Sequence, residues 1–172
     1  HYLVNLSDTP QANLARLQAD FQRLGIDIHT SCRIANSTLL KLIKKINQIL
    51  RPHIDSPQFK KMEFITRLHL SEDTTDTLSH FVNAANARLF NISIQADSSI
   101  GEEVYLSPSV TIGQNSHIGH RCFLTPDTYI GSFCKIGAKV YFNPGCRIGD
   151  KVTVEAMTTF KPHTNVPSNT DV

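Results

Sequence analysis

The sequence lacks several features that would point directly to a class of protein. Of its 172 residues, 17 are Lys or Arg and 15 are Asp or Glu, so the formal net charge is only +2. This balance gives no reason to expect a nucleic acid or another polyanion as partner. No apolar run reaches the roughly 20 residues that a membrane-spanning helix needs. No secretory signal is recognisable, and because the chain opens at His1 without methionine we interpret it as a fragment or processed chain.

The chain does contain a six-residue repeat, over about residues 94–166. From Ile100 the eleven frames are IGEEVY, LSPSVT, IGQNSH, IGHRCF, LTPDTY, IGSFCK, IGAKVY, FNPGCR, IGDKVT, VEAMTT and FKPHTN. Every frame opens with an aliphatic residue or Phe, and its fifth residue is small or compact. Prolines stand third in every third frame, from Pro108 to Pro162. Three short strands should therefore make one coil of a solenoid, with the fourth strand stacked on the first.

The repeat also predicts how the coils are packed. A single coil cannot bury its apolar face alone, so neighbouring coils must bury it together. The large first residue and the compact fifth residue of each frame should then face inward. Glycine, second in six of the eleven frames, suits a bend where φ is positive or where backbones approach closely.

Cysteines are few, and the repeat accounts for three of the four. Cys122, Cys134 and Cys146 all stand fifth in their frames, and their spacing matches no zinc motif. We therefore predict buried structural thiols, no metal site, and a reducing, cytoplasmic setting. Cys32 stands outside the repeat and is assigned no role.

This pattern resembles the hexapeptide-repeat acyltransferase superfamily, whose solenoid is a left-handed parallel β-helix. The hand is implied by the resemblance, because the general rule for parallel crossovers favours the right-handed form. The predicted fold class is α+β, with a mostly helical N-terminal region followed by a left-handed parallel β-helix. We place the two domains at residues 1–91 and 92–172.

The N-terminal domain should open with a short β-α-β unit: a strand at 2–5, an amphipathic helix at 11–24 ended by Gly25, and a strand at 26–29. Such a unit could bind a nucleotide, but its turn lacks a glycine-rich phosphate loop, and the alternative is a plain packing unit. Further helices are predicted at 38–50, at 58–68 and from about 71 to 89. Their expected role is to cover the open edge of the first coil. The lysines of the 38–50 helix could touch acidic lipid or simply face solvent.

The most informative local run is HIGHRC, residues 117–122. It resembles a segment of the acyltransferases that acylate UDP-N-acetylglucosamine, and related segments of sugar O- and N-acetyltransferases. The resemblance implies that His120 is the general base, which must lie within hydrogen-bond reach of the acceptor hydroxyl or amine. Arg121 replaces the family's acidic or amide residue and could hold a carboxylate or phosphate. The predicted substrate-binding residues are Asn115, His117, Gly119 and Arg121. The alternative is that both histidines are ordinary surface residues of a solenoid face.

Two other relatives of this fold are disfavoured by their motifs. The zinc site of γ-class carbonic anhydrases uses two histidines five residues apart, but Cys122 and Thr125 stand five residues after His117 and His120. The catalytic Asp-His pair of serine acetyltransferases is replaced here by Ser107-Pro108.

The resemblance implies transfer of an acetyl or longer acyl group from acetyl-CoA or another acyl-CoA to a hydroxyl or amine of a sugar or nucleotide-sugar. The implied assembly is a homotrimer with its active sites in clefts between subunits. Residues 165–170 resemble the start of a closing segment of many such acetyltransferases. The sequence stops at Val172, before the CoA-contacting loop of that segment, so the loop is either cut off or lacking. The alternative function is a non-catalytic β-helix scaffold or binding module, because function does not follow from fold.

Overall fold

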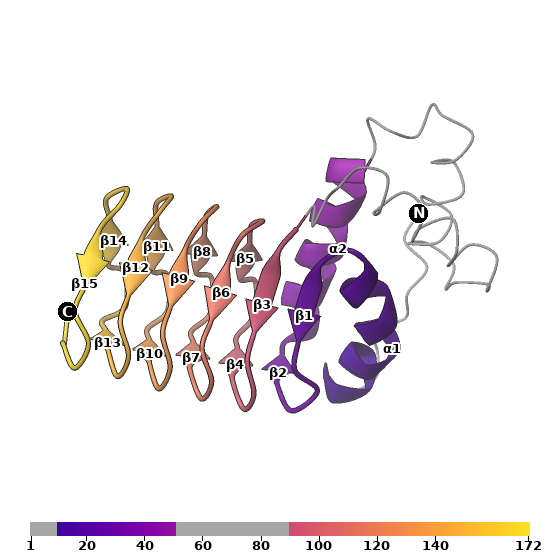
Figure 1. The fold of residues 1–172 in the computed structure, drawn as a ribbon, viewed down its shortest axis with the longest axis horizontal. Coiled ribbons are helices and arrows are strands. Elements are labelled where there is room, and N and C mark those ends of the chain that lie inside the picture. The colour runs from indigo at the N-terminus through magenta and orange to yellow at the C-terminus, as the bar shows by residue number, and fades with distance from the viewer. Residues whose placement is uncertain (1–9, 51–89) are drawn as a thin grey trace.

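The computed structural model describes residues 10–50 and 90–172. It has the predicted fold class, with helices near the N-terminus followed by a left-handed parallel β-helix (Figure 1). The strand predicted at 2–5 and the helices predicted at 58–68 and 71–89 lie outside the described residues. Within the described residues, no helix has the length and apolar character to cross a membrane.

The first helix, α1 (Pro10–Arg23), forms where the sequence predicted it. A proline in the first helical turn removes an N–H that has no partner there in any case. The helix ends before Gly25, whose φ of 78° reverses the backbone direction at low cost. Its buried stripe consists of Leu14, Leu17 and Phe21, with Leu24 just after the helix.

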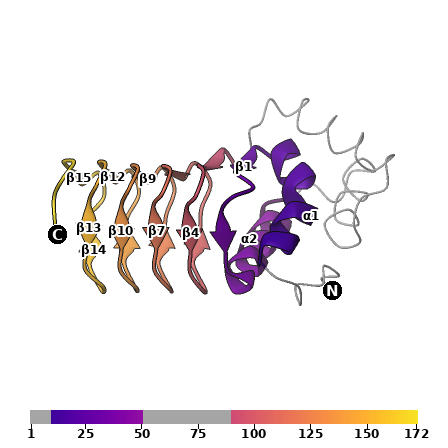
Figure 2. The same cartoon turned by 90° about the horizontal axis from the view of Figure 1, so that it is seen from below.

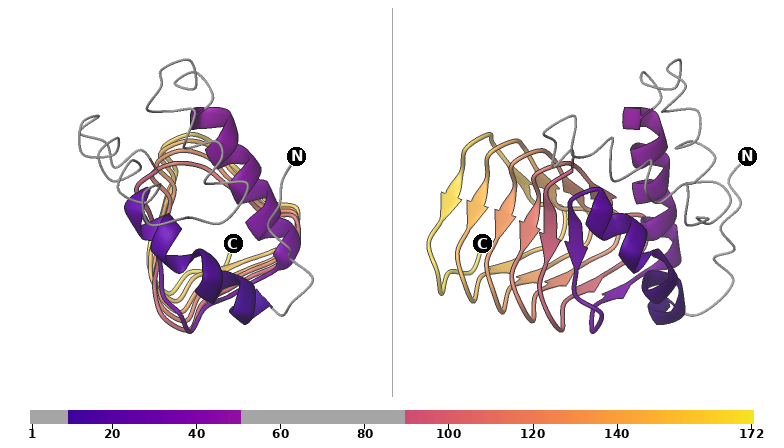
Figure 3. Two further views of the ribbon diagram at one scale, coloured as in Figure 1. Left: turned by 90° about the vertical axis from the view of Figure 1, so that its right-hand side faces the viewer. Right: turned by 45° about the vertical axis from the view of Figure 1, so that its right-hand side comes forward.

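The solenoid has three parallel sheets, one on each side of a prism. Sheet A contains β1 (Ile26–Ile28), β3 (Ile92–Ile94), β6 (Thr111–Ile112), β9 (Tyr129–Ile130), β12 (Arg147–Ile148) and β15 (Asn165–Val166). Sheet B contains β2 (Arg33–Ile34), β4 (Ser99–Ile100), β7 (His117–Ile118), β10 (Lys135–Ile136) and β13 (Thr153–Val154). Sheet C contains β5 (Tyr105–Leu106), β8 (Phe123–Leu124), β11 (Tyr141–Phe142) and β14 (Thr159–Phe160). Seen end-on, the coils superimpose on one triangular outline (Figure 3).

The core follows the predicted frame. First-position side chains from Ile100 to Val166 are all buried, as are the fifth-position side chains from Val104 to Val152. Strand partners in consecutive coils are eighteen residues apart, as in the pairing of Ile112 with Ile130. Like side chains therefore stack along the axis, and Phe142 lies on Phe160 with ring centroids 5.1 Å apart.

The serines at the fifth position form their hydrogen bonds with the neighbouring coil. The Ser98 hydroxyl donates to the Gly113 carbonyl (2.7 Å) and accepts from the Ser116 N–H (3.2 Å). The Ser116 hydroxyl repeats this one coil on, donating to the Gly131 carbonyl (2.6 Å) and accepting from the Cys134 N–H (3.1 Å). A buried hydroxyl or thiol can therefore replace Val here without leaving an unpaired group.

The corners explain the glycines. The residue with positive φ is the fourth of each frame, at every corner from Asp97 to Asn169. The second-position glycines do not have positive φ. They are needed because adjacent coils come close: a Cβ on Gly113 would lie 2.6 Å from the carbonyl carbon of Gly131. Of the two reasons that the sequence left open for these glycines, close backbone approach is the one observed.

The first coil is a hybrid of strands and helix. β1 and β2 pair with β3 and β4, and α2 (Asn36–Leu50) takes the third side, packed against β5. The placement of Cys32 outside the repeat is therefore wrong. It occupies the fifth position of the frame 28–33, and its thiol lies 3.0 Å from the Gln95 carbonyl, as Cys134 does from Gly149.

The two helices close this end of the prism. α1 packs on β1 and β2, and α2 covers the edge of β5, as predicted for the helical region (Figure 3). The predicted boundary between residues 91 and 92 does not divide the sheets, because β1 and β2 belong to sheets A and B. The division of the chain into two domains otherwise stays a prediction.

Candidate functional site

The predicted base lies at a corner of the prism, between sheets B and C. His120 is third in its frame, after β7, and is exposed. It borders a surface pocket of about 500 Å³. The residues that line this corner pocket are Glu102, Glu103, His120, Arg121, Ala138 and Lys139.

The eighteen-residue coil builds this pocket from three successive corners. The third positions supply Glu102, His120 and Ala138, and the fourth positions supply Glu103, Arg121 and Lys139. Of these six residues, only His120 and Arg121 were predicted from the sequence. The signal for the others was present, since residues eighteen positions from a site residue occupy the same corner one coil away.

His120 has a structural contact that bears on its chemistry. The Glu102 backbone N–H donates to its Nδ1 over 2.8 Å. A backbone amide can only donate, so Nδ1 must hold a lone pair in this arrangement. The neutral ring then carries its hydrogen on Nε2.

The same corner bond recurs elsewhere in the solenoid. At the corner between sheets A and B, the Ser132 N–H donates to Asp150 Oδ1 (2.8 Å), and the Asp150 N–H donates to Ser168 Oγ (2.9 Å). In each case a polar side chain at the third position accepts from the third-position amide of the preceding coil. We call these third-position side chains corner caps. His120 is therefore a corner cap as well as a residue of the pocket.

Glycines make room for these caps. A Cβ on Gly101 would lie 2.7 Å from His120 Nδ1, so the glycine admits the ring. Gly119 faces the next coil in the same way, and a Cβ there would lie 2.6 Å from the Gly137 carbonyl carbon. The structure thus gives Gly119 a packing role, and its role beside a substrate stays a prediction.

The pocket carries charges of both signs. Arg121 Nε donates to Glu103 Oε2 over 2.9 Å, with the two side chains 63% and 50% exposed. Such an exposed pair adds little stability and is free to exchange partners. Glu102 accepts from the Ser37 hydroxyl of α2 over 2.7 Å, so the helix is tied to this corner.

The remaining predicted residues lie around sheet B. His117 points outward from β7, and its Nδ1 lies 2.5 Å from the Ser99 hydroxyl of β4. Asn115 stands at the opposite corner, between sheets A and B, and is not among the residues lining the corner pocket. The structure therefore brings His120 and Arg121 together and leaves Asn115 across the face from them.

The three thiols of the repeat are buried as predicted, and Cys32, for which no role was predicted, is buried as well. Cys32, Cys122, Cys134 and Cys146 are free and buried. Burial raises the pKa of each thiol above its ordinary value of 9.0, although nearby backbone hydrogen bonds oppose the shift. These cysteines are therefore core residues and poor nucleophiles. Within residues 10–50 and 90–172, no group of three or more His, Cys, Asp or Glu could hold a metal ion.

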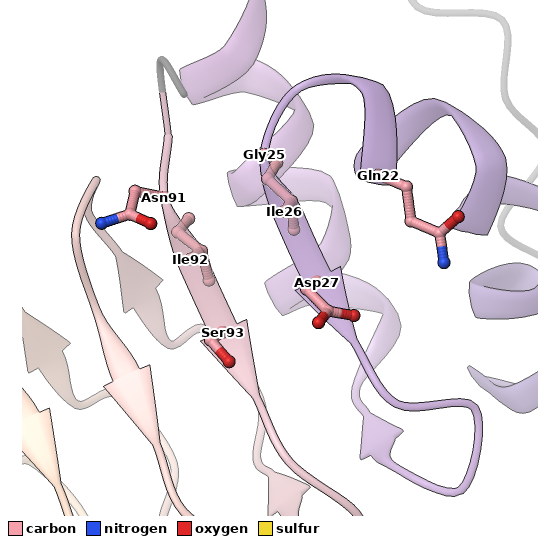
Figure 4. A pocket seen from close by; sticks show the side chains of 7 residues that line it. All are labelled: Gln22, Gly25, Ile26, Asp27, Asn91, Ile92 and Ser93. Carbon is pink, nitrogen blue, oxygen red and sulfur yellow. The ribbon is translucent and has the colours of Figure 1, made fainter. Parts of the chain in front are cut away.

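A second pocket, of about 420 Å³, lies where the end of α1 meets sheet A (Figure 4). Its lining residues are Gln22, Gly25, Ile26, Asp27, Asn91, Ile92 and Ser93. It is bounded by β3 and by β1, the second strand of the β-α-β unit for which the sequence left nucleotide binding open. Four of the seven lining residues have polar or charged side chains (Gln22, Asp27, Asn91 and Ser93), and Asp27 is the ionisable one among them.

Comparison with known protein families identifies the repeat. Residues 127–162 match the family model described as bacterial transferase hexapeptide, six repeats. This part of the solenoid therefore matches transferase-type hexapeptide repeats, in agreement with the resemblance seen in the sequence. A search of curated proteins found no match.

Among solved structures, one similar chain is a perosamine N-acetyltransferase variant from Caulobacter crescentus, in complex with CoA and GDP-perosamine. It is 13% identical, with 79% of this chain and 89% of that chain covered and a TM-score of 0.40. Another is serine acetyltransferase isoform 3 from Entamoeba histolytica, in complex with cysteine. It is 16% identical, with 80% and 60% covered and a TM-score of 0.32. At these values the likeness carries no information about substrate or mechanism.

Proposed function

We propose that this protein is an acyltransferase that moves an acetyl or longer acyl group from acyl-CoA to a hydroxyl or amine of a sugar or nucleotide-sugar. The main support is the corner pocket, where the histidine and arginine of HIGHRC meet acidic and basic groups of neighbouring coils on a transferase-type solenoid. Such a pocket can orient a polyhydroxyl acceptor and receive its proton.

His120 is the proposed general base. Its Nε2 can accept a proton only when Nδ1 carries the hydrogen of the neutral ring, so the bond from the Glu102 N–H must open when the acceptor binds. The acceptor oxygen or nitrogen then forms a bond to the thioester carbonyl carbon while His120 takes its proton. The C–S bond breaks, and the CoA sulfur leaves with that proton.

We further propose a homotrimer, because the corner pocket is a surface hollow on one chain and a cleft between prisms would enclose it. The four reduced, buried thiols support a cytoplasmic setting, where acyl-CoA is available.

The test compares His120→Asn with Asp150→Ala, measuring CoA release from acetyl-CoA over a panel of sugar and nucleotide-sugar acceptors. Asn keeps an acceptor for the Glu102 amide but cannot act as a base, so turnover should fall by about 10²-fold or more. Asp150→Ala loses an equivalent cap away from the pocket and should keep its activity. Full turnover in His120→Asn would show that His120 is not the general base.

The second candidate is a non-catalytic scaffold. It is favoured by the corner caps, because the contact of His120 with the Glu102 amide is matched by Asp150 and Ser168, which are not in the pocket. An intact trimer, verified by light scattering, that neither binds nor turns over acetyl-CoA would support this candidate.

A further inference from the structure

The outer face of sheet B carries a column of polar side chains in register. These are the sixth-position residues Arg33, Ser99, His117, Lys135 and Thr153, each paired with the next across the sheet. Alternation along a strand turns them outward while the first-position residues face the core. Figure 2 shows the strands β4, β7, β10 and β13 side by side on this face.

This column is basic, unlike the columns on the other two faces. From Arg33 to Lys135 it contains no carboxylate, and neither of these two side chains forms an ion pair with another described residue. The corresponding column of sheet C is aromatic, and that of sheet A includes Asp27 and Arg147. The carboxylate in line with the column is Asp171, which bridges to Thr153 beyond Lys135.

The corner residues beside β7 and β10 also contribute to the electrostatic potential at this face. On one side stand Asn115 and Ser132, with the Asp150 carboxylate of the next coil 2.8 Å from the Ser132 N–H. On the other side stand Arg121, which is paired with Glu103, and Lys139. The other acidic corner residues near this face, Asp97 among them, lie beside β4, one coil toward the N-terminus. The most favourable place for an anion is therefore over β7 and β10.

His117 is oriented for a ligand on this face. Its Nδ1 is held by the Ser99 hydroxyl at 2.5 Å, which can donate or accept depending on the tautomer. When the hydroxyl donates, Nε2–H is a free donor in the neutral ring, so no protonation is required.

We propose that the outer face of β7 and β10 binds a phosphate or diphosphate group through His117 and Lys135. Adjacent strands are about 4.8 Å apart, so both side chains can reach one phosphate. Arg33, three strand spacings or roughly 14 Å from Lys135, is placed for a second phosphate of the same ligand. The inference rests on the proposed function only for the source of the diphosphate, since acyl-CoA and nucleotide-sugars both carry one.

The test is calorimetric titration of inorganic pyrophosphate into the full chain, its Lys135→Ala and His117→Ala variants, and Lys161→Ala. Lys161 is an exposed lysine after sheet C and serves as the matched control. Each sheet B variant should bind pyrophosphate about tenfold more weakly or worse, with Lys161→Ala unchanged. Raising the salt concentration should weaken binding to the wild-type chain. Absence of binding by the wild-type chain, or equal binding by Lys135→Ala and Lys161→Ala, would overturn the proposal.

Two further titrations, with acetyl-CoA and with UDP-N-acetylglucosamine, identify the source of the diphosphate as the ligand whose affinity falls in Lys135→Ala. His120→Asn separates this site from the proposed reaction, because it should bind pyrophosphate as the wild type does. If pyrophosphate binding is present but no acyl transfer is detected, the anion site stands and the proposed function fails. If acyl transfer persists in Lys135→Ala with unchanged affinity for the substrates, the anion-site proposal is wrong and the proposed function stands.

Discussion

Within the repeat, a side chain of an inner coil has equivalents eighteen residues away, one coil before it and one coil after it. This gives a way to separate structural from chemical roles at single residues. His120 shares its hydrogen bond with Asp150 and Ser168, so that bond says nothing about catalysis. What distinguishes His120 is its place in a pocket beside Arg121 and Lys139. Residue-scale tests should therefore compare equivalent positions.

The buried thiols give a prediction at this scale. Because burial raises their pKa in the folded chain, the unfolded chain ionises first, and it loses protons above its thiol pKa of about 9 while the folded chain does not. Thiol-linked stability is therefore fully present below pH 9 and falls as the pH rises beyond it. Urea unfolding of the wild type and of Cys122→Val, at intervals from about pH 7 to 10.5, would measure this.

Val is a fair control because it occupies the fifth position in other frames, as at Val104 and Val140, and cannot ionise. The variant should lose less stability than the wild type over the alkaline range. Parallel curves for the two proteins would show that Cys122 does not contribute to the pH dependence.

The corner is the repeating element that sets which residues the solenoid tolerates. Its fourth residue has positive φ in every coil, and no β-branched residue occupies that place between Asp97 and Asn169. In this region of backbone space a Cβ crowds the following carbonyl, and a second branch makes the crowding worse.

We therefore expect Lys151→Ile to destabilise the fold by about 1–2 kcal/mol, because isoleucine resists the φ of 53° at this corner. Lys151→Asn should be close to neutral, since asparagine adopts this conformation readily. Chemical denaturation of both variants would test this. Equal stabilities would mean that the corner relaxes to another conformation.

The sequence predicted the regular part of these elements well. The period of six assigned the buried first positions and the fifth positions as far as Val152 correctly, because each coil repeats the same inward geometry. The fifth-position residues of the last two frames, Thr158 and Thr164, are only half-buried. It did not reveal that residues 28–33 form a frame of the same kind, since one frame has no neighbour in sequence to establish a period. That the frame belongs to the solenoid depends on β1 pairing with β3 across more than sixty residues.

The candidate site was predicted in part. HIGHRC drew attention to His120 and Arg121, and both line the corner pocket. The bond from Glu102 to His120 could not be predicted from the run itself, because it joins two coils and depends on the side-chain rotamer. The polar residues at equivalent third positions, Asp150 and Ser168, were the available signal for such a bond.

At the scale of the whole molecule, the helices α1 and α2 cover the end of the stack that begins with β1, β2 and β5. In a solenoid each coil contacts only its neighbours, so the coils at this end depend on the helices for burial. The core of α2 is formed by Leu39, Leu42, Ile43 and Ile46.

Truncating one of these side chains should loosen that end first. Ile43→Ala removes a fully buried side chain and should cost about 2–5 kcal/mol. Hydrogen exchange followed by mass spectrometry should show faster exchange at β5 and β2 than at β11. Lys41→Ala, at an exposed position of the same helix, is the control and should leave exchange unchanged. Uniform acceleration along all coils would instead mean that the prism unfolds as one unit.

The helices that cover the first coil also limit how copies of the chain can associate through their strand edges. Head-to-tail growth of a filament needs two complementary strand edges on every copy, one at each end of the stack. Here α1 and α2 lie over one of those edges, so the end that begins with β1 has no free strand to offer (Figure 1). The hybrid first coil thus acts as a terminator of β-sheet polymerisation as well as the start of the fold.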